Sequence, residues 1–149
     1  MNLDDRENIL IDKCTPIGFF FNNKTAMMGP LVIFPKTILC WNVSSGNDIN
    51  KESLSLFTAL EPKPDIVVIG LETQYEYSKI VKMKEVLHDK QINVEVLPTD
   101  IACGIYNFLC NEGRYVGAAL IPPLRSENPI LKRLKSNMST IQKQKLIES

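Results

Sequence analysis

Four residues with the potential to bind a small molecule follow two stretches with strand character. Gly70 and Glu72 come after the β-branched run IVVI, and Thr99 and Asp100 follow an alternating stretch that begins at Asn93. Ligands of open α/β sheets collect beyond the carboxyl ends of the strands, where helix N-termini favour anions. The pattern is weak, because Gly70 lacks the other glycines of a dinucleotide-binding loop and two of the four residues are acidic. The alternative is that Gly70 and Thr99 are a turn residue and a helix cap.

The four cysteines are Cys14, Cys40, Cys103 and Cys110, and none forms a CxxC pair. With a single histidine in the chain, a zinc site of the usual spacing is not expected. In a helix over 100–112, Cys103 and Cys110 would lie about 10.5 Å apart, which exceeds the roughly 7 Å limit for a disulfide. Cys103 would occupy the first helical turn, where a thiolate is stabilised, so it is a nominal nucleophile. We favour free thiols, with Cys103 buried between helix and sheet.

Sequence motifs of the common enzyme classes are absent. The chain has no G-x-S-x-G elbow, no HExxH and no P-loop. His88 lies near the end of a lysine-rich predicted helix and is expected on the surface. The aromatic residues are not interleaved with lysine or arginine, so nucleic-acid binding is not expected. We therefore predict no catalytic residue, no cofactor and no metal.

Two further residues are candidate contacts for a protein partner. Trp41 is one, because tryptophan is enriched at interface hot spots. It could equally pack beneath the first predicted helix. Arg114, which shortly precedes the last predicted strand, is the other.

The elements that must position these residues alternate from Asp65 onward. The patterns predict a strand at 65–70, a helix over 77–87, a strand from Asn93, a helix over 100–112 closed by Gly113, and a strand at 116–121. This order favours a largely parallel sheet covered by helices. Within helix 100–112 one apolar face is expected, made of Ile101, Ile105, Phe108 and Leu109.

The first third of the chain has short apolar runs separated by Gly, Pro and Asn, which is typical of β structure. We expect a loose arm over 1–16 with a strand at 9–11, then a hairpin over 17–28, strands at 31–34 and 37–43, and a helix over 51–60 capped by Asn50. A length of 149 residues suits one domain, which we place at 17–124.

Residues 125–149 form a basic tail. They hold six basic residues and two acidic ones, a net charge of +4, so the neutral chain carries −4 over residues 1–124. After Pro129, apolar residues recur at helical spacing from Ile130 to Ile141, which suits a helix that docks on a partner or an anionic membrane, or a solvated tail. No stretch is long enough to span a membrane. The N-terminus resembles neither a secretory signal nor a transit peptide, so a longer form would have to supply a presequence.

Three segments carry a resemblance to a known family: WNV at 41–43, LEPKPDIVVIG at 60–70, and TDIACGIYNFLCNEGRYVGAALIPP at 99–123. Over residues 17–123 the chain resembles the mitochondrial complex I assembly factor 3 family of small α/β domains. The family often has a Gly-rich turn after the central strand, where this chain has GLET at 70–73.

This resemblance implies a three-layer fold around a central mixed, mostly parallel sheet, and no catalytic activity. It implies a place in the mitochondrial matrix, peripheral to the inner membrane. The expected partners are a second assembly factor and subunits of the quinone-binding peripheral arm of complex I. The alternative is a domain outside mitochondria that binds a small molecule or anion through the rim at Gly70 and Thr99.

Overall fold

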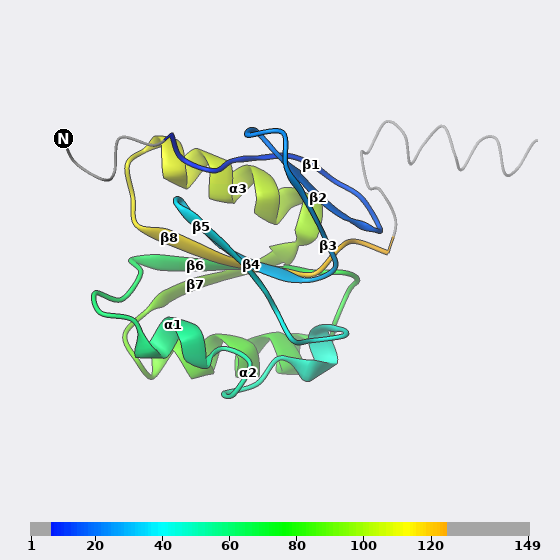
Figure 1. The fold of residues 1–149 in the computed structure, drawn as a ribbon. Coiled ribbons are helices and arrows are strands. Elements are labelled where there is room, and N and C mark those ends of the chain that lie inside the picture. The colour runs from blue at the N-terminus through cyan, green and yellow to red at the C-terminus, as the bar shows by residue number, and fades with distance from the viewer. Residues whose placement is uncertain (1–6, 125–149) are drawn as a thin grey trace, which may run out of the picture.

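The computed structural model describes residues 7–124 and arranges them in three layers around a five-stranded sheet (Figure 1). Its strand order is β5-β4-β8-β6-β7. These strands are β4 (Leu31–Phe34), β5 (Thr37–Cys40), β6 (Ile66–Leu71), β7 (Asn93–Pro98) and β8 (Val116–Leu120). One face is covered by the short 3-10 helix η1 (Gly46–Asp48), α1 (Ser55–Ala59) and α2 (Tyr77–His88).

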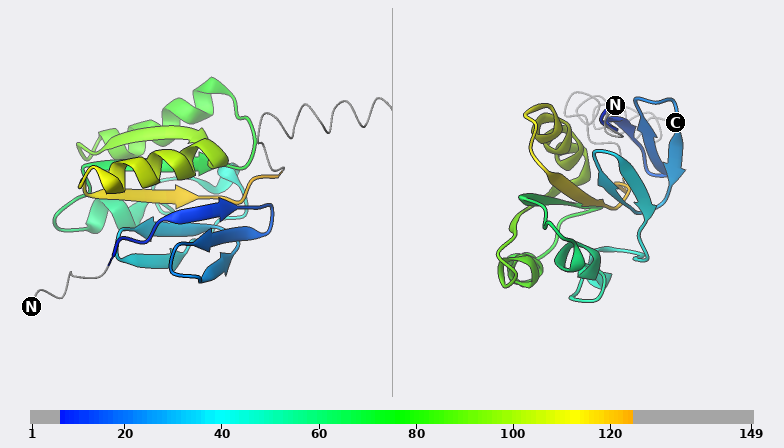
Figure 2. Two further views of the ribbon diagram at one scale, coloured as in Figure 1. Left: turned by 90° about the horizontal axis from the view of Figure 1, so that it is seen from above. Right: turned by 60° about the vertical axis from the view of Figure 1, so that its left-hand side comes forward.

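The opposite face is covered by α3 (Thr99–Asn111) and by a second, antiparallel sheet of three strands. These strands are β1 (Ile11–Cys14), β2 (Gly18–Phe21) and β3 (Ala26–Met28). Figure 2 shows this small sheet standing beside α3 on the same side of the central sheet. The predicted N-terminal hairpin is β2 and β3, and β1 joins it as a third strand.

The central sheet is mixed, as expected. β6 pairs in parallel with both β7 and β8, whereas β4 runs antiparallel to both β8 and β5. The chain leaves β6 through α2 on one face and leaves β7 through α3 on the other. The predicted three-layer α/β fold is therefore confirmed.

Strand β6 is buried on both faces, which explains its continuous β-branched sequence. Val67 and Ile69 pack with α1 and α2, while Val68 packs with α3. Strand β8 alternates in the same way, with Ala119 on the α1 side and Ala118 on the α3 side. Two apolar clusters therefore share one sheet.

The face of α3 that packs on the sheet differs from the predicted one. The buried residues of this helix are Thr99, Ala102, Cys103, Tyr106, Leu109 and Cys110. Ile101 and Phe108 instead remain 51% and 59% exposed. The predicted face is therefore buried at Leu109 and half-buried at Ile105, and the prediction was wrong for Ile101 and Phe108. The helix is rotated because Thr99 and Ala102 lie against Gly70, which lets the helix approach the sheet closely.

The C-terminal end of α3 is closed as predicted. Gly113 adopts a left-handed φ of 75°. Its N–H donates to the carbonyl of Cys110 at 3.0 Å, and the next N–H, of Arg114, donates to the carbonyl of Leu109 at 3.2 Å. This pair of hydrogen bonds is a Schellman motif, in which glycine avoids the steric cost of the left-handed conformation.

Three predicted elements differ in extent. The strand expected at 9–11 lies at Ile11–Cys14, so part of the expected N-terminal arm is paired in a sheet. The strand expected at 37–43 ends at Cys40, and the helix expected over 51–60 is α-helical only at Ser55–Ala59. The division into arm, domain and tail stays a prediction, and the tail lies outside the described residues.

Asn50 caps the turn before α1, without directly capping the helix itself. Its side-chain oxygen accepts from the Ser53 N–H at 2.9 Å, and the Ser53 hydroxyl accepts from the Asn50 N–H at 2.8 Å. These reciprocal bonds have the logic of a capping box.

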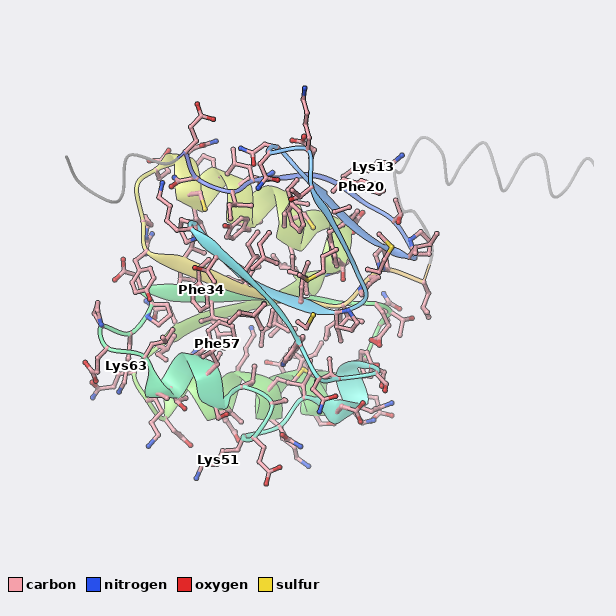
Figure 3. All side chains as sticks on the ribbon, viewed as in Figure 1. Lys13, Phe20, Phe34, Lys51, Phe57 and Lys63 are labelled. Atoms are coloured by element: carbon pink, nitrogen blue, oxygen red, sulfur yellow. The ribbon has the colours of Figure 1, made fainter. Side chains whose placement is uncertain are left out.

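Phe57 is the largest side chain that α1 places in the core. It is fully buried, and its ring centroid lies 5.7 Å from that of Phe34 on β4. Figure 3 shows both rings between the sheet and α1, whereas Phe20 belongs to the outer three-stranded sheet. Phe57 thus joins α1 to β4 within the apolar cluster on this side of the sheet.

We expect Phe57→Ala to lower the free energy of unfolding by about 3–5 kcal/mol, because it leaves a cavity and removes an aromatic contact. Phe20→Ala is the matched control, since Phe20 is 41% exposed and its truncation should cost less than about 1 kcal/mol. Urea unfolding followed by circular dichroism measures both. Equal losses would contradict this account of the core.

Candidate functional site

A hollow opens where the connections of two neighbouring strands diverge. The chain after β6 passes to one face of the sheet and the chain after β7 passes to the other, which is the arrangement that forms ligand crevices in open α/β sheets. The hollow has a volume of about 890 Å³. It is lined by Leu71, Glu72, Thr73, Gln74, Tyr75, Ile80, Val96, Leu97, Pro98, Thr99, Asp100, Pro123 and Leu124.

The predicted rim residues meet at this hollow. Glu72, Thr99 and Asp100 line it, and Gly70 lies directly beneath the first turn of α3. A Cβ on Gly70 would be 2.8 Å from a methyl of Leu120 and 3.1 Å from the Cα of Thr99. Gly70 is therefore needed for close packing of α3 on the sheet.

The carboxylate of Glu72 is already engaged by the protein. Its two oxygens lie 2.9 and 3.2 Å from the Gly46 nitrogen, whose N–H donates to them from the start of η1. Burial, followed by a hydrogen bond to Glu72, raises the pKa of the neighbouring Tyr75 above its ordinary value. Glu72 thus ties the loop that contains η1 to the end of β6.

Thr99 has a different role from the predicted helix cap. It is 1% exposed, and its hydroxyl donates to the carbonyl of Ile121 at 2.6 Å. Pro98 occupies the N-cap position, and no side-chain hydrogen bond caps the helix there. The cap prediction was wrong for Thr99 because its hydroxyl instead joins the start of α3 to the chain after β8.

Trp41 and Arg114 do not join the rim residues in one site. Trp41 is 7% exposed and its indole N–H donates to the carbonyl of Ser53 at 2.8 Å, so the packing alternative holds. Arg114 is exposed at the far end of α3. Because α3 has 13 residues, its two ends are about 20 Å apart.

The thiols and the histidine lie away from the hollow's lining. His88 is exposed at the end of α2, as predicted. All four cysteines are free, with Cys103 and Cys110 buried. No group of three potential metal ligands occurs within residues 7–124, and no helix among them is long and apolar enough to cross a bilayer.

The hollow's chemistry does not favour an anion. Glu72 and Asp100 contribute carboxylates, and no lysine or arginine is among its lining residues. The hollow better suits a neutral or cationic group that donates hydrogen bonds.

Sequence reasoning missed Tyr75 and the segment after β8. The sequence predicts no role for Tyr75, and it places Pro123 and Leu124 beyond the strand expected at 116–121. The N–H of Leu124 donates to the carbonyl of Glu72 at 3.2 Å, which brings residues distant in sequence to the same rim. The double proline at 122–123 indicated the end of the strand and gave no signal of this contact.

We expect Thr99→Val to lower the free energy of unfolding by about 1–3 kcal/mol, because the buried carbonyl of Ile121 loses its donor. Thr99→Ser is the matched control: it keeps the hydroxyl and loses one methyl, worth about 0.8 kcal/mol. Urea denaturation compares the two. A valine variant as stable as the serine variant would show that this hydrogen bond is dispensable.

Comparisons with known proteins agree on one family. Residues 11–121 match the family described as protein of unknown function DUF498/DUF598. A Bordetella pertussis protein described as a Mth938-like domain has the same fold, with a TM-score of 0.63 at 18% identity over 85% of this chain and 95% of that one.

Curated relatives match at higher identity. NADH dehydrogenase (ubiquinone) 1 alpha subcomplex assembly factor 3 of Drosophila melanogaster is 42% identical over 134 residues, covering 87% of this chain and 68% of the relative. The protein of that name from Homo sapiens is 42% identical over 113 residues, covering 76% of this chain and 60% of the relative. The chain thus spans about two thirds or less of these relatives. It belongs to the DUF498/DUF598 family and is a homologue of complex I assembly factor 3.

Proposed function

We propose that this protein is a non-enzymatic assembly factor for mitochondrial respiratory complex I. The observation that carries the proposal is the 42% identity to the Drosophila assembly factor over 87% of the chain. The protein would act in the matrix, peripheral to the inner membrane. There it would bind a second assembly factor and subunits of the quinone-binding peripheral arm while that arm is built.

The outer face of α3 is the surface best suited to such a partner. Ile101 and Phe108 lie two turns apart and are more than half exposed, with the half-buried Ile105 between them. Gly104 is exposed between the same turns and leaves this strip without a polar side chain at its centre. We call Ile101, Gly104, Ile105 and Phe108 the α3 strip. An apolar segment of a protein partner is the occupant it fits, because contact would remove both large side chains from water.

The double variant Ile101→Asp and Phe108→Asp should lose recovery of complex I peripheral-arm subunits by at least about tenfold, because each carboxylate would be buried against an apolar partner. Affinity purification of the tagged protein from mitochondria measures this. A second assay measures whether the variant restores complex I in cells that lack the protein, and the double variant should fail to do so.

The control places one aspartate on a different surface. Ile17→Asp changes a side chain that is 70% exposed near the start of β2, so it should keep both recovery and rescue. Recovery that is lost with Ile17→Asp and kept with the double variant would refute the α3 strip as the binding surface. Normal complex I in cells without the protein would refute the function itself.

A small-molecule-binding role is the second candidate, and the hollow of about 890 Å³ at the strand ends favours it. A ligand present at a hundred times its Kd would stabilise the fold by about 2.7 kcal/mol. A thermal-shift screen of nucleotides, amines, cofactors and anions should then show an upward shift in Tm that Asp100→Ala reduces. If no compound class raises Tm, the small-molecule-binding role has no support.

A further inference from the structure

Strand β1 is held along α3 by side chains of the helix. The Asn107 amide accepts from the N–H of Ile11 at 2.9 Å and donates to the carbonyl of the same residue at 2.8 Å. The Tyr106 hydroxyl donates to the carbonyl of Ile9 at 2.9 Å. These three hydrogen bonds fix the register between residues that are 96 or 97 positions apart in sequence.

This register brings two cysteines together. Cys14 ends β1 three residues after Ile11, and Cys103 lies on α3 one turn before Asn107. Cys14 packs against the apolar cluster that contains Cys103. The β1 contacts run in opposite order along α3, from Asn8 at Cys110 to Ile11 at Asn107, so that Cys14 comes to lie next to the first turns of the helix, where Cys103 is. The other two cysteines have no such relation: Cys40 is exposed on β5, and Cys110 is buried beside Tyr106.

The two thiols have unequal surroundings. Cys14 is half-buried, whereas Cys103 is 6% exposed. A hydrogen bond from Cys103 lowers the pKa of Cys14, against opposing effects of burial and of the Asp100 charge. The same hydrogen bond, followed by burial, raises the pKa of Cys103. Cys14 is therefore the more accessible thiol, and its surroundings favour the thiolate more than those of Cys103 do.

We propose that Cys14 and Cys103 form a peroxide-responsive thiol pair that closes to an intrachain disulfide between β1 and α3. The Cys14 thiolate attacks one oxygen of hydrogen peroxide and the O–O bond breaks, which gives a sulfenic acid and hydroxide; the hydroxide takes up the proton that the Cys14 thiol released and becomes water. The Cys103 sulfur then attacks the Cys14 sulfur, the S–O bond breaks, and the oxygen leaves as water with the Cys103 proton. Two thiols are oxidised and one peroxide is reduced.

The fold supports closure between these two residues. Sensor cysteines are accessible thiols beside a resolving thiol, and this pair has that asymmetry. The hydrogen bonds around Asn107 and Tyr106 already hold β1 on the helix, so closure adds a covalent bond to an existing contact. This thiol chemistry is separate from the proposed assembly function and does not depend on it.

The test uses the full chain with Cys40→Ser, which removes the exposed thiol on β5. One equivalent of hydrogen peroxide should reduce the titratable thiols from three to one and lower the intact mass by two hydrogens. Non-reducing digestion and mass spectrometry should identify the linked peptide containing Cys14 and Cys103, and dithiothreitol should release it.

Two further variants separate the steps. In the same background, Cys103→Ala should leave Cys14 as a sulfenic acid that dimedone traps, and Cys14→Ser should prevent the disulfide. Cys110→Ser is the matched control, because it removes a buried thiol of the same helix and should leave the linked peptide unchanged. Circular dichroism checks that each variant is folded. Absence of the linked peptide from the oxidised Cys40→Ser protein, or an equal loss of two titratable thiols after Cys14→Ser, would overturn the proposal.

Discussion

Burial of strand β6 on both faces is the constraint on which the rest of this structure depends. Val67 and Ile69 need one apolar cover and Val68 needs another, so helices must lie on both sides of the sheet. The chain meets this need by sending α2 over one face and α3 over the other. The divergence of these two connections opens the hollow at the carboxyl ends of β6 and β7.

Three sides of helix α3 have different surroundings. Its buried side chains pack on the central sheet, and Gly70 permits the close approach of Thr99 and Ala102. Its flank binds β1 through Asn107 and Tyr106 and places Cys103 beside Cys14. Its outer side exposes Ile101 and Phe108. The proposed assembly role and the proposed thiol chemistry therefore share one helix, yet they use different side chains.

The rim residues predicted from sequence have structural roles. Glu72 holds the N–H of Gly46, and Thr99 holds the carbonyl of Ile121. Both bonds connect segments that are more than twenty residues apart, and neither partner carries a local sequence signal. Because Glu72 and Thr99 each follow a strand, the sequence could predict that they lie at the rim of the sheet. It could not predict what they bind, because their partners are backbone groups brought close by the fold.

The sequence by itself determined the order of elements from Asp65 onward, because hydrophobic periodicity and the punctuation by Gly and Pro act over a few residues. It also located the helix end at Gly113, since the left-handed φ is a local requirement. Only the tertiary structure decided which stripe of α3 is buried, since Ile101 and Ala102 belong to overlapping apolar faces and the close approach at Gly70 selects the face with Ala102. The tertiary structure alone brought Cys14 close to Cys103, because residues so distant in sequence become neighbours only when β1 is docked on the helix.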